Sequence, residues 1–147
     1  MNCLKCKKQD TKVIDSRVST NCVKRRRECI YCHFRFTTYE HPEPIDLKVI
    51  KRNKELEDYH REKIISGLQK AFPKREITDE KIEQIVCAVE KTIFHKYPHK
   101  IKSATIGKII LNKLKKVDKI AYLRFASVYK NFSDVKSFYK EAQKINK

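Results

Sequence analysis

Glycine is scarce in this chain of 147 residues, which contains only two. A phosphate-binding loop of the type GxxxxGK(S/T) requires two glycines within one short motif, and no such motif occurs. The chain also lacks an acidic pair where a magnesium ion would be expected. We therefore expect a protein that is not an enzyme and, in particular, does not hydrolyse nucleotides.

Long apolar runs are missing as well. No stretch approaches the roughly 20 residues that a membrane-spanning helix needs, and the first residues have no apolar core of a signal peptide. We expect a cytoplasmic protein with no membrane partner. A reducing cytosol also keeps thiols available for metal binding.

Cysteine, by contrast, is concentrated at one end, because five of the six cysteines lie in the first 32 residues. Cys3-Leu-Lys-Cys6 and Cys29-Ile-Tyr-Cys32 are two CxxC pairs separated by 22 residues. Each CxxC turn lets two sulfurs converge on one ion, and two turns complete a tetrahedral zinc shell without a catalytic position. We predict one structural zinc held by Cys3, Cys6, Cys29 and Cys32. Two disulfides or four unrelated buried thiols are the alternatives, but neither explains the repeated spacing.

The domain boundary is predicted at His41-Pro-Glu-Pro44, where two prolines interrupt regular structure. We expect an α+β protein with a zinc-ribbon domain at residues 1–44. A mainly helical domain, opened by a β-hairpin, is expected at residues 45–147. The chain is long enough for a metal-stapled module followed by a domain of about a hundred residues.

The net charge of +17 favours a polyanionic partner. The segments 11–18 and 23–28 predict a β-hairpin turned at Ser19-Thr20-Asn21. Its returning strand carries four consecutive cations, which are either a solvated face or a nucleic-acid contact. Guanidinium groups bind phosphates bidentately and can read guanine edges, so a rigid metal scaffold favours the contact. The candidates are Arg17, Lys24, Arg25, Arg26 and Arg27.

The segment Phe34-Arg-Phe-Thr-Thr-Tyr39 alternates in character and predicts the last strand of the ribbon. We expect Phe34 and Phe36 to form its small core. Arg35 and Tyr39 would then face outward, which adds Arg35 to the DNA-binding candidates.

The second half begins with a predicted hairpin, 46–52 and 55–57, turned at Asn53-Lys54. Apolar residues then recur with a helical period, with Thr78 expected to cap the second helix and Ser133 the last. Pro73 and Pro98 fall between the predicted helices. The predicted apolar stripes are Ile64, Ile65, Leu68 and Phe72; Ile82, Ile85, Val86, Val89 and Ile93; Ile106, Ile109, Ile110, Leu114 and Val117; Ile120, Leu123 and the neighbouring aromatic residues to about Phe132; and Val135, Phe138 and Tyr139.

Two sets of motifs resemble the NrdR family, bacterial repressors of ribonucleotide reductase genes. The zinc-ribbon part is carried by Val13-Ile-Asp-Ser-Arg17, Arg25-Arg-Arg-Glu-Cys29 and Arg35-Phe-Thr-Thr-Tyr-Glu40. The ATP-cone part is carried by Val49-Ile-Lys-Arg52, Arg61-Glu-Lys-Ile64 and Ala121-Tyr-Leu-Arg-Phe-Ala-Ser-Val-Tyr129. The resemblance covers nearly the whole chain and keeps the family's order.

The resemblance implies a repressor that binds promoter boxes in double-stranded DNA and senses ATP and dATP. It also implies a homo-oligomer whose assembly changes with the nucleotide. Cationic side chains in the implied set could neutralise a triphosphate, while its aliphatic side chains offer an apolar wall to a purine. The implied nucleotide contacts are Val49, Lys51, Arg52, Glu57, Lys63 and Ile64, with Ser103, Ile106, Tyr129 and Lys130 from later helices.

The chain departs from the family pattern at several positions. Asn53-Lys54 replaces the usual Asp-Gly turn, which predicts a strained or altered turn. Lys7 and His33 replace the glycine that often follows each CxxC, so we expect less regular knuckles. Cys22 or His33 could substitute as a zinc ligand, and Cys87 has no expected role. The rival function is a zinc-ribbon factor that binds RNA or RNA polymerase, with the helical half as an interaction domain.

Overall fold

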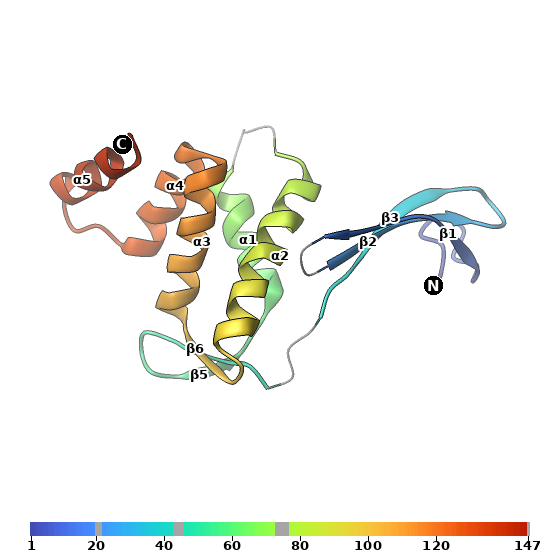
Figure 1. The fold of residues 1–147 in the computed structure, drawn as a ribbon, viewed down its shortest axis with the longest axis horizontal. Coiled ribbons are helices and arrows are strands. Elements are labelled where there is room, and N and C mark those ends of the chain that lie inside the picture. The colour runs from blue at the N-terminus through green and yellow to red at the C-terminus, as the bar shows by residue number, and fades with distance from the viewer. Residues whose placement is uncertain (20–21, 43–45, 73–76, 147) are drawn as a thin grey trace. The chain divides into compact units, whose positions relative to one another are not determined.

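The structure is a computed structural model that describes residues 1–19, 22–42, 46–72 and 77–146. It divides into two compact units, Met1–Glu43 and Pro44–Lys147, and each is described by itself (Figure 1). The predicted turn residues Thr20 and Asn21, and the prolines Pro44 and Pro73, lie outside the described residues. The predicted α+β fold class is confirmed. No helix in the described ranges is both long and apolar enough to cross a membrane.

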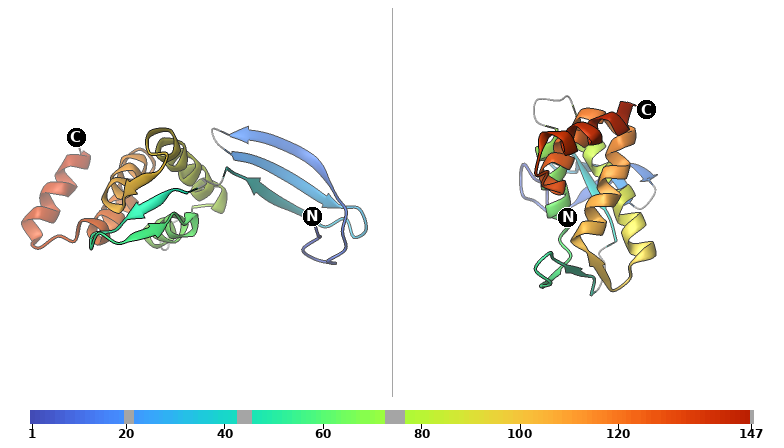
Figure 2. Two further views of the ribbon diagram at one scale, coloured as in Figure 1. Left: turned by 90° about the horizontal axis from the view of Figure 1, so that it is seen from below. Right: turned by 90° about the vertical axis from the view of Figure 1, so that its left-hand side faces the viewer.

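The first unit is a three-stranded antiparallel sheet in the order β1-β2-β3 (Figure 2). Its strands are β1 (Thr11–Ser19), β2 (Cys22–Cys29) and β3 (Arg35–Glu40). A β-bulge interrupts the pairing of β1 with β2 between Val13 and Asp15. The predicted hairpin and final strand of the ribbon are therefore both present.

The small core of this unit differs from the prediction. The rings of Phe34 and Phe36 stack with their centroids 6.2 Å apart, but Phe34 remains 38% exposed. The side chains that are buried instead are Cys3, Cys22, Glu28 and Cys29. A single three-stranded sheet offers aromatic side chains little second surface, so the cysteine knuckles supply the core.

The second unit contains a small sheet in the order β5-β4-β6. The strands are β4 (Lys48–Ile50), β5 (Leu56–Asp58) and β6 (Lys100–Lys102). β4 pairs antiparallel with β5, as the predicted hairpin requires, and parallel with β6, which was not predicted. Ile101, the central residue of β6, is 2% exposed and anchors this strand in the core.

Five helices complete the described part of this unit. The first four pack against one another. The sheet lies at one end of this group (Figures 1 and 2). Thr78 caps the second helix as predicted, because its side chain accepts a hydrogen bond from the Lys81 N–H. The helices are α1 (Arg61–Ala71), α2 (Asp79–Lys96), α3 (Ser103–Val117), α4 (Lys119–Lys130) and α5 (Val135–Asn146).

The predicted stripes of α1, α2 and α3 supply most of the hydrophobic core, with Leu68, Val86, Val89, Ile93 and Leu114 fully buried. The last residue of the α3 stripe, Val117, is an exception at 40% exposure. These helices therefore form the interior against which the sheet and α4 pack.

The predicted stripes of α4 and α5 are wrong in part. Ile120 is 47% exposed, whereas Leu123 and the neighbouring aromatic side chains lie in or against the core as predicted. The buried residues of α4 also include Ala121 and Ala126, which were not predicted. Small residues let α4 approach its neighbours closely.

The apolar side chains predicted for α5 are also largely exposed, with Val135 at 83% and Tyr139 at 62%. The buried residues of this helix are Glu141 and Ile145. Its first turn is capped by Asp134 rather than by Ser133, because the Asp134 carboxylate accepts a hydrogen bond of 2.8 Å from the Ser137 N–H.

Candidate functional site

The two CxxC turns have the same local geometry. The Lys7 N–H donates to the Cys3 carbonyl at 2.9 Å, and the His33 N–H donates to the Cys29 carbonyl at 3.1 Å. Lys7 and His33 adopt positive φ angles of 58° and 55°. The two turns are therefore as regular as each other, and the expected irregularity is absent. The left-handed backbone of Lys7 and His33 destabilises the fold by about 1 kcal/mol at each residue.

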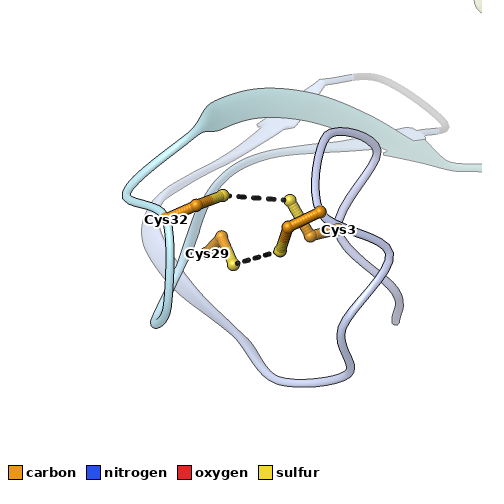
Figure 3. A group of neighbouring side chains, drawn as sticks. Cys3, Cys29 and Cys32 are labelled. Atoms are coloured by element: carbon orange, nitrogen blue, oxygen red, sulfur yellow. Dashed lines mark hydrogen bonds between the residues drawn. The ribbon is translucent and has the colours of Figure 1, made fainter.

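These turns bring four sulfur atoms together, all within 4.8 Å of one another. The Sγ atoms of Cys3 and Cys32 are 3.6 Å apart, as are those of Cys6 and Cys29 (Figure 3). A zinc ion with four Zn–S bonds of about 2.3 Å would space its sulfurs at about 3.8 Å, whereas a disulfide would need about 2.0 Å. All six cysteines are free, so the geometry fits a metal and not the disulfide alternative.

Backbone hydrogen bonds favour thiolates within this cluster. The N–H of Cys6 is the main cause that lowers the pKa of Cys3 to about 6, and the N–H of Cys32 lowers the pKa of Cys29. The N–H of Phe34 acts in the same direction on Cys32. Burial and the neighbouring thiols outweigh it, however, and raise the pKa of Cys32 to about 11. Cys3 and Cys29 therefore lose their thiol protons more readily than Cys32 does, and a bound metal cation would displace the protons from all the thiols that bind it.

The substitute ligands do not join the cluster. Among the described residues, the group of possible metal ligands holds only the four predicted cysteines. Cys22 is buried elsewhere in the ribbon, and His33 Nδ1 lies 3.8 Å from Glu28 Oε1. Cys87 belongs to the other unit, where the Arg61 guanidinium lies 3.7 Å from its sulfur.

The DNA-binding candidates lie on all three strands of the ribbon. Arg17 of β1 pairs with Lys24 of β2, and Arg26 of β2 pairs with Thr37 of β3. Arg35 begins β3 and donates from Nε to Glu28 at 2.7 Å. The sheet therefore gathers these cations on one small element, although neighbouring residues of a strand point to opposite faces.

The second unit contains a cavity of about 390 Å³, which is within the range of small-molecule sites. Residues from β4, β5, α1, α3 and α4 line it, so distant parts of the sequence meet there. All the predicted nucleotide contacts except Arg52 and Lys130 line this cavity, namely Val49, Lys51, Glu57, Lys63, Ile64, Ser103, Ile106 and Tyr129.

Glu57 is the shared partner in a cluster of charged side chains that line the cavity. Its carboxylate forms ion pairs with both Lys51 and Lys63, and His60 Nε2 lies 3.9 Å away. Glu57 itself is only 21% exposed, whereas the lysine side chains are 46% and 62% exposed. The two cations therefore lean on a shared carboxylate that an incoming anion would have to replace.

The two predicted contacts outside the lining have other partners. Arg52 donates from Nη2 to the carbonyl of Tyr129, which connects the β4–β5 turn to α4. Lys130 donates from Nζ to Glu141 at 2.6 Å and so connects α4 to α5. Both residues flank Tyr129, whose ring lines the cavity.

In the wall formed by α4, the sequence analysis predicted Tyr129 as a contact but missed Phe125, Arg124 and Val128. Phe125 and Tyr129 stack with their centroids 6.0 Å apart, and each ring lies against one of the chain's two glycines, Gly67 and Gly107. The available signal was that these glycines stand inside helices, where glycine is unfavourable unless close packing requires it. Arg124 and Val128 also line the cavity from this helix.

A buried ionic network supports Tyr59, another residue of the cavity lining. Arg61 is 8% exposed and forms ion pairs with Glu83 at 2.8 Å and Glu90 at 3.3 Å. The Tyr59 hydroxyl donates to Glu90 at 3.0 Å, and burial, followed by the charge of Glu90, raises the pKa of Tyr59. This network fixes Tyr59, which lines the cavity. The sequence signal was Glu90 within an apolar stripe.

Comparison with known proteins adds to this geometry. A family model described as the N-terminal domain of NrdR-like transcriptional repressors matches residues 1–40, and the ATP cone domain matches residues 47–135. The transcriptional repressor NrdR of Finegoldia magna is 44% identical to the chain, and the match covers 99% of each protein. The chain belongs to the NrdR family of transcriptional repressors. NrdR of Clostridium perfringens is 43% identical over 100% of both chains, and that of Lachnoclostridium phytofermentans is 46% identical over 99% of this chain and 96% of its own length.

The NrdR resemblance read from the sequence is thus confirmed. The cysteine cluster lies in the part of the chain that matches the NrdR zinc ribbon, and the cavity lies in the part that matches the ATP cone. The two domain matches together cover residues 1–40 and 47–135 of the chain.

Proposed function

We propose that this protein represses ribonucleotide reductase genes and that the adenine nucleotide in its cone sets its affinity for their promoters. It acts as a regulator and not as an enzyme. One observation carries the proposal: residues chosen from the sequence as nucleotide contacts converge on one cavity, although they come from five separate elements.

The four-cysteine cluster is proposed to hold one structural zinc ion. Cys3 and Cys6 precede the sheet, while Cys29 ends β2 and Cys32 follows it. A metal that joins both pairs would cross-link the two ends of the hairpin and stiffen it. Because the ribbon buries few side chains, this cross-link would supply much of the stability that holds its cations in place.

The cavity is proposed to bind ATP or dATP. Val49, Ile64 and Ile106 offer apolar surface to the base, and Lys51 and Lys63 offer positive charge to the phosphates. The triphosphate would replace the Glu57 carboxylate as the partner of these lysines, which leaves Glu57 available to the rest of the ligand. The nucleotide therefore exchanges one set of ion pairs for another.

Repression requires that the nucleotides bind the DNA-competent and incompetent states with different affinities. We propose that these states are different homo-oligomers. A symmetric assembly would place paired ribbons on paired promoter boxes at a spacing fixed by helical turns of the DNA. A different assembly would misplace the same ribbons.

The proposal is tested by calorimetric titration of ATP and dATP into the zinc-loaded protein, with its mass followed by light scattering. Mobility shifts are then measured on duplexes taken from upstream of reductase genes, on scrambled duplexes of equal length and on structured RNA. We expect saturable binding of at least one nucleotide, a change in mass and a nucleotide-dependent preference for the promoter duplex. Equal affinity for all three nucleic acids, with and without nucleotide, would contradict the proposal and favour a general RNA-binding factor.

A further inference from the structure

The consecutive cations of β2 do not form one surface. Side chains alternate along a strand, and cross-strand partners share a face. Arg17 is the partner of Lys24, and Asp15 is the partner of Arg26, so these residues lie on one face of the sheet. Arg25 and Arg27 alternate with Lys24 and Arg26 along β2, so their side chains point to the opposite face of the sheet.

The first face, here called the basic face, carries Lys12, Arg17, Lys24, Arg26 and Arg35. Its cations are well exposed: the side chains of Lys12, Arg17 and Arg35 have 56%, 80% and 60% of their surface accessible. Arg26 is also exposed, and no ion pair holds it within the part of the chain that the structure describes. Cations of all three strands can therefore reach a partner together.

Glu28 arranges two of these cations. It is 7% exposed and accepts from Arg35 Nε at 2.7 Å, and its other oxygen lies 3.0 Å from Lys12 Nζ. Arg35 uses Nε for this contact, which leaves the terminal nitrogens of its guanidinium for another acceptor. The carboxylate thus positions two cations of the basic face.

The opposite face is built differently. Arg25 Nε lies 2.7 Å from Glu40 Oε1, Arg27 Nη2 lies 3.5 Å from the same oxygen, and Arg27 Nε donates to Thr38. Their side chains are only 34% and 16% exposed. Val18 of this face is 83% exposed, and Phe36, which pairs with Arg27, stacks on Phe34. This face thus offers two arginines that share one carboxylate and lie beside apolar side chains, so it suits a phosphate backbone less well than the basic face does.

We infer that the ribbon places its basic face against the phosphodiester backbone of duplex DNA, and that Arg25 and Arg27 brace the sheet instead of contacting DNA. This inference rests on the proposed function and assigns the DNA contact to one side of the ribbon. It separates residues that the sequence presents as a single cationic run.

Two matched double variants test the inference in the full-length, zinc-loaded protein. Arg17→Ala/Arg26→Ala removes two guanidinium groups from the basic face, and Arg25→Ala/Arg27→Ala removes two from the other. Both variants lose the same charge, so a general electrostatic attraction weakens equally. The dissociation constant for a promoter duplex is measured as a function of salt, and zinc content and nucleotide affinity are measured alongside to verify folding.

We expect the first variant to bind roughly tenfold more weakly and to reduce the slope of log Kd against log salt by about 1.8, which corresponds to two lost phosphate contacts. The second variant should keep a slope close to that of the unaltered protein. A larger loss in the second variant, or unchanged binding in the first, overturns the inference. If the unaltered protein shows no salt-dependent preference for the promoter duplex, the proposed function itself fails.

A third variant keeps the test decisive if Arg25→Ala/Arg27→Ala loses its zinc. Glu40→Gln retains both arginines and releases them from their shared carboxylate. If the basic face binds DNA, this change leaves the salt slope unaltered. A steeper slope would show that the released arginines reach phosphates, and that result overturns the inference.

Discussion

The ring of Tyr129 occupies the space that a side chain on Gly107 would need. A Cβ atom added to Gly107 would lie 2.0 Å from Tyr129 Cε2, far inside van der Waals contact. The Tyr129 hydroxyl also donates a hydrogen bond to the carbonyl of Ala104, which fixes the position of the ring against Gly107. Gly107 therefore sets how closely α4 approaches α3 along the cavity wall.

Gly107→Ala is expected to displace the Tyr129 ring and weaken nucleotide binding. Overpacking costs about 1–3 kcal/mol, and the better helix propensity of alanine returns about 1 kcal/mol. We expect a net loss of about 1 kcal/mol in the free energy of unfolding, measured by denaturant titration. Nucleotide affinity is measured by calorimetry.

The matched control is Gly67→Ala, the same change at the chain's other glycine. Its Cβ would lie 3.4 Å from Phe125 Cε2, which is ordinary contact. We expect equal or higher stability, because only the gain in helix propensity remains. If both variants bind nucleotide as the unaltered protein does, the α4 wall is not part of the site.

Lys51→Ala/Lys63→Ala is expected to weaken binding of ATP and dATP by roughly tenfold to a hundredfold, because charge-assisted contacts to the triphosphate are lost. Calorimetry measures the effect, and DNA binding without nucleotide should persist. The control, Lys81→Ala/Lys91→Ala, removes the same charge from exposed positions of α2. If the two double variants bind nucleotide with equal affinity, Lys51 and Lys63 do not contact it and the assignment of the nucleotide site to this cavity is wrong.

Cys6→Ser is expected to reduce bound zinc well below one ion per chain and to abolish promoter binding, because three thiolates no longer close the shell. Elemental analysis and mobility shifts measure both effects. Cys22→Ala is the control, because Cys22 is buried in the same unit but lies outside the cluster. Nucleotide binding should survive in Cys6→Ser, since the cavity belongs to the other unit. Full zinc content in Cys6→Ser would contradict the predicted ligand set.

The cysteine cluster and the main helices could be predicted because their signals are local. Two CxxC pairs fix the ligand types, and the apolar period of α2 fixes its buried face. β6 could not be predicted, because three residues with one isoleucine carry no period and the strand exists only through its parallel pairing with β4. Long-range pairing of this kind leaves no trace in the segment itself.

The side walls of the cavity were also beyond local reasoning. In α4, the small Ala121 and Ala126 are buried and the larger Ile120 stays exposed, so hydrophobic size alone misplaces these residues. Gly67 and Gly107 acquire meaning only once the rings of α4 lie against them. The division of the arginines between two faces, in contrast, follows from strand alternation once the register is known.

Lys54→Gly is expected to stabilise the second unit by about 0.5–1 kcal/mol. Lys54 has a φ of 69° in the turn after β4, and this left-handed backbone costs a residue with a side chain about 1–2 kcal/mol. Glycine avoids that cost, but its greater conformational entropy in the unfolded chain offsets part of the gain. Denaturant titration measures the change. Lys91→Gly in the interior of α2 is the control and should destabilise by about 0.7 kcal/mol. A loss of stability in both variants would show that the turn is not strained.

The contact between α4 and α5 is expected to weaken in acid. Burial opposes ionisation of Glu141, but hydrogen bonds from Lys130 and the Tyr122 hydroxyl prevail and lower the pKa of Glu141 to about 2. A lowered pKa means that the contact contributes full stability above the unfolded value of about 4.5. That contribution is lost as the pH falls from there toward 2. Hydrogen exchange of the α5 amides, measured between pH 5 and pH 3, should therefore accelerate beyond its intrinsic pH dependence, and Glu141→Gln should remove the excess. If the additional acceleration of exchange persists in Glu141→Gln, it arises from another carboxylate.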